Sequence, residues 1–138
     1  MNETVVEELK ALADETRLRM ISLLWEGGDM CSCEIERILD IRQSNASRHL
    51  HRLRQAGLVE SYRKAQWIHY VIPEVHRSGG GYLHGLIETA RSRGGPYRDD
   101  IAKLEDYRSR GFTCATIHEW VPFAAPAGAG TRDEEVET

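Results

Sequence analysis

The spacing of two short helical patterns around a tight turn constrains the fold of this chain more than any other feature. The first pattern runs from about Cys31 to Leu39, and the second runs from Gln43 to Ala56. Gly57 follows at the C′ position that glycine commonly takes after a helix. Two helices of this length with so short a connection predict a helix-turn-helix.

Two strand-like patterns come next. Leu58–Arg63 is followed, after residues 64–66, by Trp67–Ile72, which is rich in β-branched and aromatic residues. Together they predict a hairpin with a polar tip. A helix-turn-helix followed by a hairpin is a winged helix-turn-helix, so we expect a mainly α-helical fold with a β-hairpin wing.

Helical patterns also flank this unit. Asp14 is placed to cap a helix over Glu15–Trp25, and Pro96 stands where proline often begins a helix. We expect three parts: a winged-helix domain over residues 1–92, a helical extension over 93–123 that carries Cys114, and a disordered acidic tail over 124–138.

Charge is distributed unevenly along the chain. The net charge of the 138 residues is −4, yet residues 41–72 carry six basic side chains and one acidic side chain. A basic segment on an acidic protein indicates a surface that contacts phosphates.

The sequence gives little support for a membrane protein, a secreted protein or an enzyme. No apolar run approaches the ~20 residues that cross a bilayer, and MNETVVEELK lacks the apolar core of a signal peptide. We therefore expect a cytoplasmic protein without a membrane partner, in which thiols stay reduced. We find no nucleotide-binding loop, no Ser/His/Asp set, no credible pair of catalytic carboxylates and no C-x-x-C motif beside a βαβ unit. The chain is therefore not expected to be an enzyme.

The second helix of the helix-turn-helix has a polar outer face. At about 100° per residue, Ala46, Leu50 and Leu53 fall together and face the core, and hydroxyl, amide and guanidinium groups lie opposite. Such groups hydrogen-bond base edges and phosphates. The predicted base contacts are Gln43, Ser44, Ser47, Arg48 and His51. The predicted phosphate contacts are Arg52 and Arg54 on the helix, and Arg63, Lys64 and Gln66 at the wing tip. His49 is predicted to be a structural, hydrogen-bonded histidine.

Four stretches, LADETRLRM, CSCEI, SRHLHRLRQAGLV and WIHY, occur in an order and spacing that resemble the ArsR family of metalloregulatory winged-helix repressors. The resemblance covers about residues 5–72. It implies a homodimer that binds double-stranded operator DNA in the absence of an inducer. The first and last helices of the core would form the dimer interface, through an apolar stripe at Val5, Leu9 and Leu12 and through the helix that carries Leu83, Ile87 and Ala90.

Cys31 and Cys33 stand two residues apart at the predicted start of a helix. Side chains with this spacing point to nearly opposite sides of a helix, so one ion that binds both sulfurs must distort the first turn. The unpaired N–H groups of that turn are predicted to lower the thiol pKa and favour the ligating thiolate. Because this helix supports the reading helix, the distortion would move the reader against the DNA, as an inducer must.

In arsenic-responsive members of the ArsR family, a C-x-C at this point binds trivalent arsenic with a third cysteine. Here the expected position of that cysteine is Glu36, a poor arsenic ligand. We therefore predict that Cys114, from the same or the partner subunit, completes a site of Cys31, Cys33 and Cys114. The alternative for Cys114 is a small buried hydrophobic residue. The predicted function is a repressor released by arsenic(III), with antimonite as a related ligand and with no organic cofactor.

Other inducers stay open. The same fold could sense cadmium or lead through these thiolates, or an oxidant or persulfide that pairs Cys31 or Cys33 with Cys114. His76, His84 and Glu88 suggest zinc, but they do not amount to a four-ligand set, so a solvated face is the preferred interpretation. A winged helix that contacts only proteins would show no salt-dependent binding to the DNA upstream of its own gene.

Overall fold

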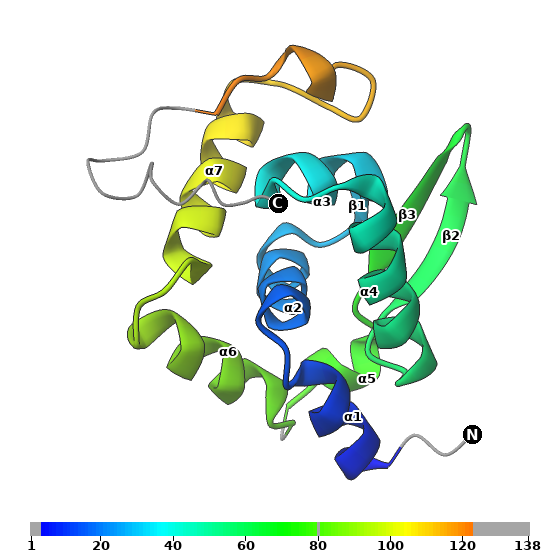
Figure 1. The fold of residues 1–138 in the computed structure, drawn as a ribbon, viewed down its shortest axis with the longest axis vertical. Helices are drawn as coiled ribbons and strands as arrows, with labels where there is room; N and C mark the ends of the chain where they lie inside the picture. The colour runs from blue at the N-terminus through cyan, green and yellow to red at the C-terminus, as the bar shows by residue number, and fades with distance from the viewer. Residues whose placement is uncertain (1–3, 80, 123–138) are drawn as a thin grey trace.

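Helix α2 (Glu15–Gly27) lies at the centre of the fold (Figure 1). The computed structural model describes residues 4–79 and 81–122. No helix within these ranges is long and apolar enough to cross a membrane. The other elements, in chain order, are α1 (Val5–Leu12), β1 (Met30–Cys31), α3 (Ser32–Leu39), α4 (Gln43–Gln55), β2 (Glu60–Lys64), β3 (Trp67–Val71), α5 (Glu74–Arg77), α6 (Leu83–Ser92), α7 (Tyr97–Ser109) and a 3-10 helix, η1 (Ile117–Glu119). Helices α1, α3, α4, α6 and α7 pack on α2.

Capping and turn residues set the ends of α2, α3 and α4. The Asp14 carboxylate accepts a hydrogen bond from the Arg17 N–H at 3.0 Å, which confirms the predicted cap of α2. Asp40 adopts a left-handed conformation (φ 58°) and begins the turn between α3 and α4. Gly57 (φ 78°) follows α4, where a side chain would be strained.

The wing contains one strand more than the predicted hairpin. β2 and β3 pair in antiparallel fashion, and only Ala65 and Gln66 remain as the tip. The two-residue strand β1 pairs with the other edge of β3, so that Cys31 stands opposite His69. A strand of two residues has no periodicity that a sequence pattern can reveal. This pairing joins the start of α3 to the wing.

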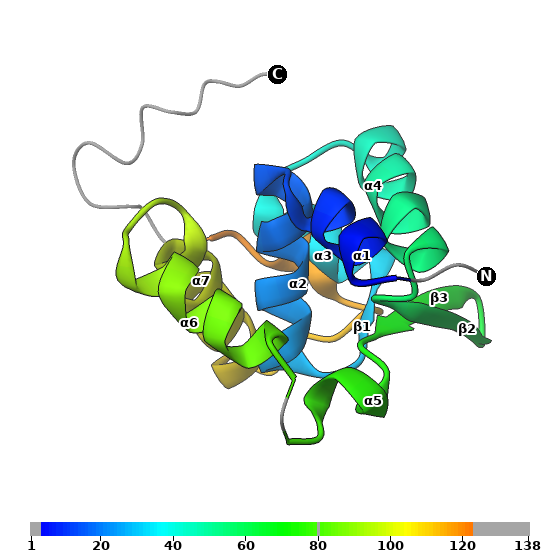
Figure 2. The ribbon, with the colours of Figure 1, turned by 90° about the horizontal axis from the view of Figure 1, so that it is seen from below.

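The predicted DNA-contacting elements and the C-terminal helices lie on opposite sides of α2. Figures 1 and 2 show α4 and the wing on one side, and α6 and α7 on the other. Helix α1 contacts both α2 and α4. The winged helix-turn-helix architecture predicted from the sequence is confirmed.

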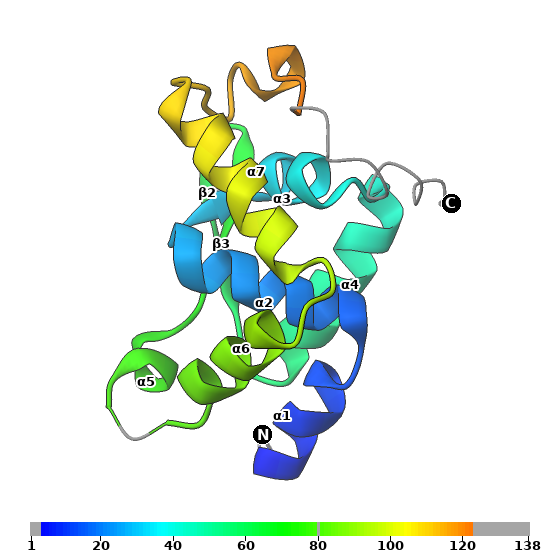
Figure 3. The same ribbon diagram turned by 90° about the vertical axis from the view of Figure 1, so that its left-hand side faces the viewer.

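The C-terminal extension packs on the winged helix. Helix α7 lies across α2 (Figure 3), and it also contacts α3. Its buried Leu104 and Tyr107 belong to the same hydrophobic core as α2, and so does Trp120 beyond it. The boundary at residue 92 stays a prediction, and the tail over residues 124–138 lies outside the described residues.

The apolar stripe predicted for the dimer interface is only partly available to a partner. Val5 and Leu9 on α1 are 56% and 46% exposed. Leu12, Leu83 and Ile87 are instead buried in the core of the same chain. Leu83 and Ile87 therefore cannot contribute to an interface as expected, because α6 turns this face toward α2. That α1 and α6 form the dimer interface stays a prediction.

A buried ion pair fastens α7 to α2. The Arg19 guanidinium donates to both carboxylate oxygens of Asp100, at 2.9 and 2.8 Å, and Asp100 is 1% exposed. The Arg19 Nη2 also donates to the Leu39 carbonyl oxygen at the end of α3, at 3.4 Å. One guanidinium thus joins α2, α3 and α7.

Replacing Asp100 with asparagine should strongly destabilise the protein, because it leaves the partly buried charge of Arg19 without its counter-charge. The free energy of unfolding should fall by about 3–5 kcal/mol. The exposed neighbour Asp99 provides the control, since Asp99→Asn should change stability by less than about 0.5 kcal/mol. Urea unfolding followed by circular dichroism measures both values. Equal stabilities of the two variants would contradict the role assigned to this pair.

Candidate functional site

Cys31 lies at the junction of the wing and α3. It is the N-cap residue of α3 and is fully buried. The prediction that it lies inside the first helical turn is wrong by one residue, because β1 pairs with β3 and holds Cys31 in an extended conformation. Cys33 is within the first turn and is half-buried.

Glu34 closes a capping box with Cys31. The Glu34 carboxylate accepts a hydrogen bond from the Cys31 backbone N–H at 3.0 Å, and the Cys31 side chain faces the Glu34 backbone N–H. The other carboxylate oxygen accepts the hydroxyl hydrogen of Tyr107, with an O–O distance of 2.6 Å. Both oxygens of this buried carboxylate are therefore held in place by neighbours.

Cys114 reaches the same place from the segment after α7. Trp120 anchors that segment: its ring packs edge-on against Tyr107, and its indole N–H donates to Asp106 at 3.0 Å. On the side of α3, Arg37 donates to the Trp120 carbonyl oxygen at 2.6 and 3.2 Å. These contacts fold the chain back over the N-terminus of α3.

Cys31, Glu34 and Cys114 form one compact group of potential ligands. One sulfur or oxygen atom from each lies within 4.8 Å of the other two, and no other such group occurs in residues 4–79 and 81–122. The structure thus brings together two of the three predicted cysteines, within one chain. Cys33 is outside the group. Sequence reasoning missed Glu34, although the Cys-x-x-Glu spacing of a capping box was available as a signal.

Burial dominates the protonation of these thiols. It raises the pKa of Cys31 far above its ordinary value, and the neighbouring Cys114 thiol adds to the effect. Burial likewise raises the pKa of Cys114. The prediction that the helix N-terminus lowers the thiol pKa is wrong for Cys31, because desolvation raises this pKa by more than the hydrogen bond from the Glu34 backbone N–H lowers it. A ligand must therefore displace protons from this pair.

The predicted reading face of α4 faces solvent. Its exposed members are Gln43, Ser44, Ser47, Arg48, His51 and Arg54, and Arg52 is half-buried. Sequence reasoning passed over Asn45, which is also exposed and accepts a hydrogen bond from the Arg48 guanidinium. The amide therefore orients the arginine on the same surface.

The wing tip carries the remaining predicted contacts. Arg63, Lys64 and Gln66 are all exposed. Tyr62 stacks on His69 of β3, with ring centres 5.4 Å apart, and donates its hydroxyl hydrogen to Asp29. These contacts tie the wing to the residues that lead into β1.

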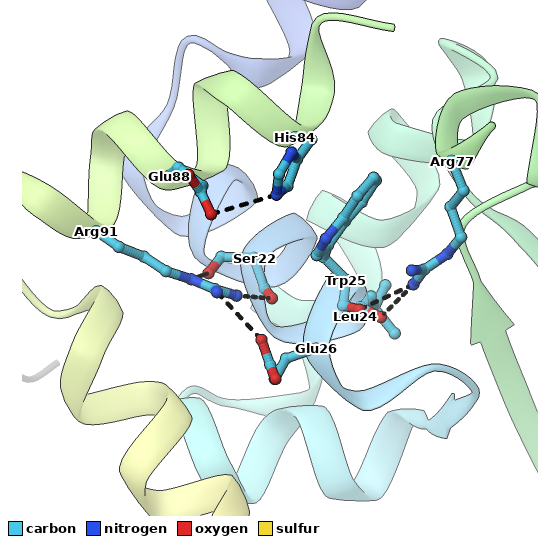
Figure 4. A network of polar contacts seen from close by, with 8 residues as sticks. All are labelled: Ser22, Leu24, Trp25, Glu26, Arg77, His84, Glu88 and Arg91. Atoms are coloured by element: carbon cyan, nitrogen blue, oxygen red, sulfur yellow. Dashed lines mark hydrogen bonds and ion pairs between the residues drawn. The ribbon is translucent and has the colours of Figure 1, made fainter. Parts of the chain in front are cut away.

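The histidines considered for zinc do not come together. His84 stacks on Trp25 and pairs with Glu88 at 3.2 Å (Figure 4), whereas a ring nitrogen of His76 lies 2.9 Å from the Gly57 carbonyl oxygen. Figure 4 also shows the arginines that fasten α5 and α6 to α2: Arg77 donates to the carbonyl oxygens of Leu24 and Trp25, and Arg91 donates to Ser22 and Glu26. This surface is structural.

Comparison with known proteins agrees with this architecture. The sequence family described as "Bacterial regulatory protein, arsR family" matches residues 14–61, from the cap of α2 into the wing. The arsenic resistance transcriptional regulator ArsR1 of Pseudomonas putida is 35% identical over 107 residues, which make up 77% of this chain and 84% of that protein. The chain belongs to the ArsR family. It is therefore a helix-turn-helix transcriptional regulator.

The names of two other similar proteins refer to different metals, cadmium and antimony. The cadmium resistance transcriptional regulatory protein CadC of Listeria innocua is 32% identical over 66 residues, 48% of this chain and 56% of that protein. The crystal structure of the AntR antimony-specific transcriptional repressor superposes with a TM-score of 0.53 at 25% identity, over 64% of this chain and 74% of AntR. Similarity to known proteins therefore does not identify the inducer of this chain.

His49 supports α4 from its inner side. The side chain is buried, and its Nδ1 lies 3.1 Å from an Arg17 nitrogen and 3.9 Å from an Asp14 oxygen, which agrees with the predicted structural, hydrogen-bonded histidine. Burial lowers the pKa of His49, and the charges of Arg48 and Arg17 act in the same direction, whereas Asp14 opposes them. The folded protein therefore favours the neutral imidazole.

This shift predicts that acid weakens the fold. Because the folded pKa of His49 is below its unfolded value of about 6.5, the stability that His49 contributes is present above that pH and is lost as the pH falls through the folded pKa. The free energy of unfolding in urea should decrease between pH 7.5 and 5, and His49→Gln should flatten the decrease. The exposed His51 is the control, and His51→Gln should keep the wild-type slope. Parallel slopes for wild type and His49→Gln would contradict this explanation.

Proposed function

We propose that this ArsR-family regulator is a homodimeric repressor that leaves its operator DNA when trivalent arsenic binds Cys31, Cys33 and Cys114. The observation that carries the proposal is the approach of Cys114 to Cys31 within one chain, where the wing meets α3. Thiolates select soft ions over magnesium or calcium.

The site can act on both DNA-contacting elements. Helix α3 packs on α4, and its buried Ile35 and Ile38 belong to the same core as Leu50 of α4. Cys31 is also the backbone partner of His69 in the wing. A change at the N-terminus of α3 therefore reaches the reading helix and the wing together.

Cys33 supplies the conformational change. It lies in the first turn of α3, outside the group formed by Cys31, Glu34 and Cys114. An ion that binds all three sulfurs draws Cys33 toward Cys31 and unwinds this turn. The ion thereby binds the DNA-free shape more tightly, which is what ligand-driven release requires.

The DNA contacts that we propose follow the exposed faces of α4 and the wing. Base contacts are assigned to Gln43, Ser44, Ser47, Arg48 and His51, and phosphate contacts to Arg52, Arg54, Arg63, Lys64 and Gln66. The exposed Val5, Val6 and Leu9 of α1 support a second copy of the chain as partner. A dimer would present two reading helices to a two-fold operator.

A divalent soft ion or an oxidant is the alternative inducer. The cadmium-resistance relative favours the first, and the proximity of the Cys31 and Cys114 thiols favours the second. Either would use the same cysteines, so the experiments below compare arsenite with cadmium and with an oxidant.

Arsenite should release the reduced protein from the DNA upstream of its own gene. Fluorescence anisotropy of labelled DNA measures this release, with cadmium and hydrogen peroxide titrated in parallel. Cys31→Ser, Cys33→Ser and Cys114→Ser should bind the DNA but resist arsenite, because each removes one sulfur ligand. Ser32→Ala, which changes the residue between two of these cysteines, should respond like the wild type. Release that persists in all three cysteine variants would reject this site as the sensor.

Arg48→Ala should weaken operator binding by about 1–3 kcal/mol, or roughly 5- to 150-fold, because arginine can bridge a guanine edge. The exposed Arg93, at the end of α6 on the far side of α2, is the matched control, and Arg93→Ala should leave the affinity unchanged. Anisotropy at fixed salt measures both variants. An equal effect of the two substitutions would contradict the placement of the DNA on α4.

A further inference from the structure

The group formed by Cys31, Glu34 and Cys114 differs from the arsenic site in one donor. Its third ligand atom is a carboxylate oxygen, and all three atoms already lie within 4.8 Å of one another with α3 intact. A soft ion such as arsenic(III) gains little from such an oxygen. Zinc-class divalent cations, in contrast, bind cysteine sulfur and glutamate oxygen together.

We propose that Cys31, Glu34 and Cys114 form a three-ligand site for a zinc-class divalent cation that leaves the regulator on its DNA. The first part of this proposal is independent of the inducer. The second part rests on the proposed function, since it states that only a ligand that recruits Cys33 unwinds α3.

Hydrogen bonds from neighbouring residues orient the Glu34 carboxylate as a metal ligand. The Cys31 N–H and the Tyr107 hydroxyl each donate to a different oxygen, at 3.0 and 2.6 Å. A carboxylate has about four lone-pair sites, so each oxygen can still bind a cation. Hydrogen bonds of this kind orient metal ligands in proteins and tune their affinity. Tyr107 is therefore the positioning residue of the site.

Burial and access also fit a bound cation. Cys31 is fully buried and Glu34 is 7% exposed, whereas Cys114 is only partly buried and leaves an approach from solvent. Three protein ligands leave the fourth tetrahedral position for water. Binding of the divalent cation releases the two thiol protons to solvent and leaves two thiolates and one carboxylate around the ion.

The third ligand distinguishes a zinc-class cation from arsenic(III). A zinc-class cation takes the Glu34 oxygen, which is already beside the two sulfurs, so the first turn of α3 keeps its shape. Arsenic(III) takes the Cys33 sulfur, which is outside the group, so that turn has to open. A ligand that requires no change of shape does not shift the equilibrium between the DNA-bound and DNA-free forms.

Cobalt(II) is the probe for this site, because sulfur-to-cobalt charge-transfer bands report thiolate ligands and visible d–d bands report tetrahedral geometry. The reduced full chain should develop both sets of bands with one Co²⁺ per chain, and Zn²⁺ should remove them. Anisotropy should show that the Co²⁺-loaded protein still binds its DNA.

Three variants identify the ligands. Glu34→Gln should lower Co²⁺ affinity by at least about tenfold and keep arsenite-driven release, since glutamine retains the helix cap but not the charge. Glu36→Gln, on the same helix but outside the group, is the matched control and should bind Co²⁺ like the wild type. Cys33→Ser should bind Co²⁺ normally and lose its response to arsenite.

Several outcomes would overturn the proposal. Wild-type Co²⁺ affinity in Glu34→Gln would mean that this carboxylate only caps α3, and loss of Co²⁺ binding in Cys33→Ser would mean a three-sulfur site. Release of DNA by Co²⁺ alone would reject the claim that the regulator stays on its DNA when the cation is bound.

Tyr107→Phe replaces Glu34→Gln if circular dichroism shows that Glu34→Gln does not fold. The expected loss in Co²⁺ affinity is about tenfold or more, and an unchanged affinity would reject the site. Failure of arsenite to release the wild type would instead reject the proposed function, with the Co²⁺ spectra unaffected.

Discussion

The buried carboxylate of Glu34 joins the three parts of the molecule that the proposed switch requires. It accepts the backbone N–H of Cys31, which ends β1, and the hydroxyl of Tyr107, which belongs to α7, while its own backbone lies in the first turn of α3. Removing a buried acceptor leaves its donors unsatisfied, at a cost of about 1–3 kcal/mol for each group. The geometry around Cys31 therefore depends on contacts that come from the wing, the helix-turn-helix and the C-terminal extension at once.

The proposed sensing site and the proposed reading helix are separated by the length of one short helix, α3. The thiols lie at the N-terminus of α3, and the turn that begins at Asp40 and leads into α4 follows its C-terminus. Arg19 approaches the Leu39 carbonyl at that second end and binds Asp100 of α7. Helix α3 is thus held at one end by the Glu34 contacts and at the other by the Arg19 network, and between them it packs on both α4 and β3 of the wing.

Sequence patterns predicted most of the winged helix, because its signals are local. The Asp14 cap, the turn before α4 and the end of α4 at Gly57 depend on neighbouring residues, and each is found as predicted. The core face of α4 follows from its periodicity, and the buried positions of Ala46, Leu50 and Leu53 confirm it. The errors arose where distant segments meet: β1 forms only because β3 provides an edge, and Leu83 and Ile87 turn inward only because α2 is there to cover them.

The sequence by itself determined the architecture, the polar face of α4 and the presence of three thiols, since helical period, caps and turn residues act over a few positions. Only the tertiary structure decided which of these thiols meet. Cys114 is about eighty residues from Cys31 in the chain, and the contacts of Trp120 with Arg37, Tyr107 and Asp106 bring it back over α3. The same folding buries Cys31, raises its pKa and places Glu34 rather than Cys33 beside the two sulfurs. Burial and the meeting of distant segments depend on how the whole chain packs, and no local pattern carries that information.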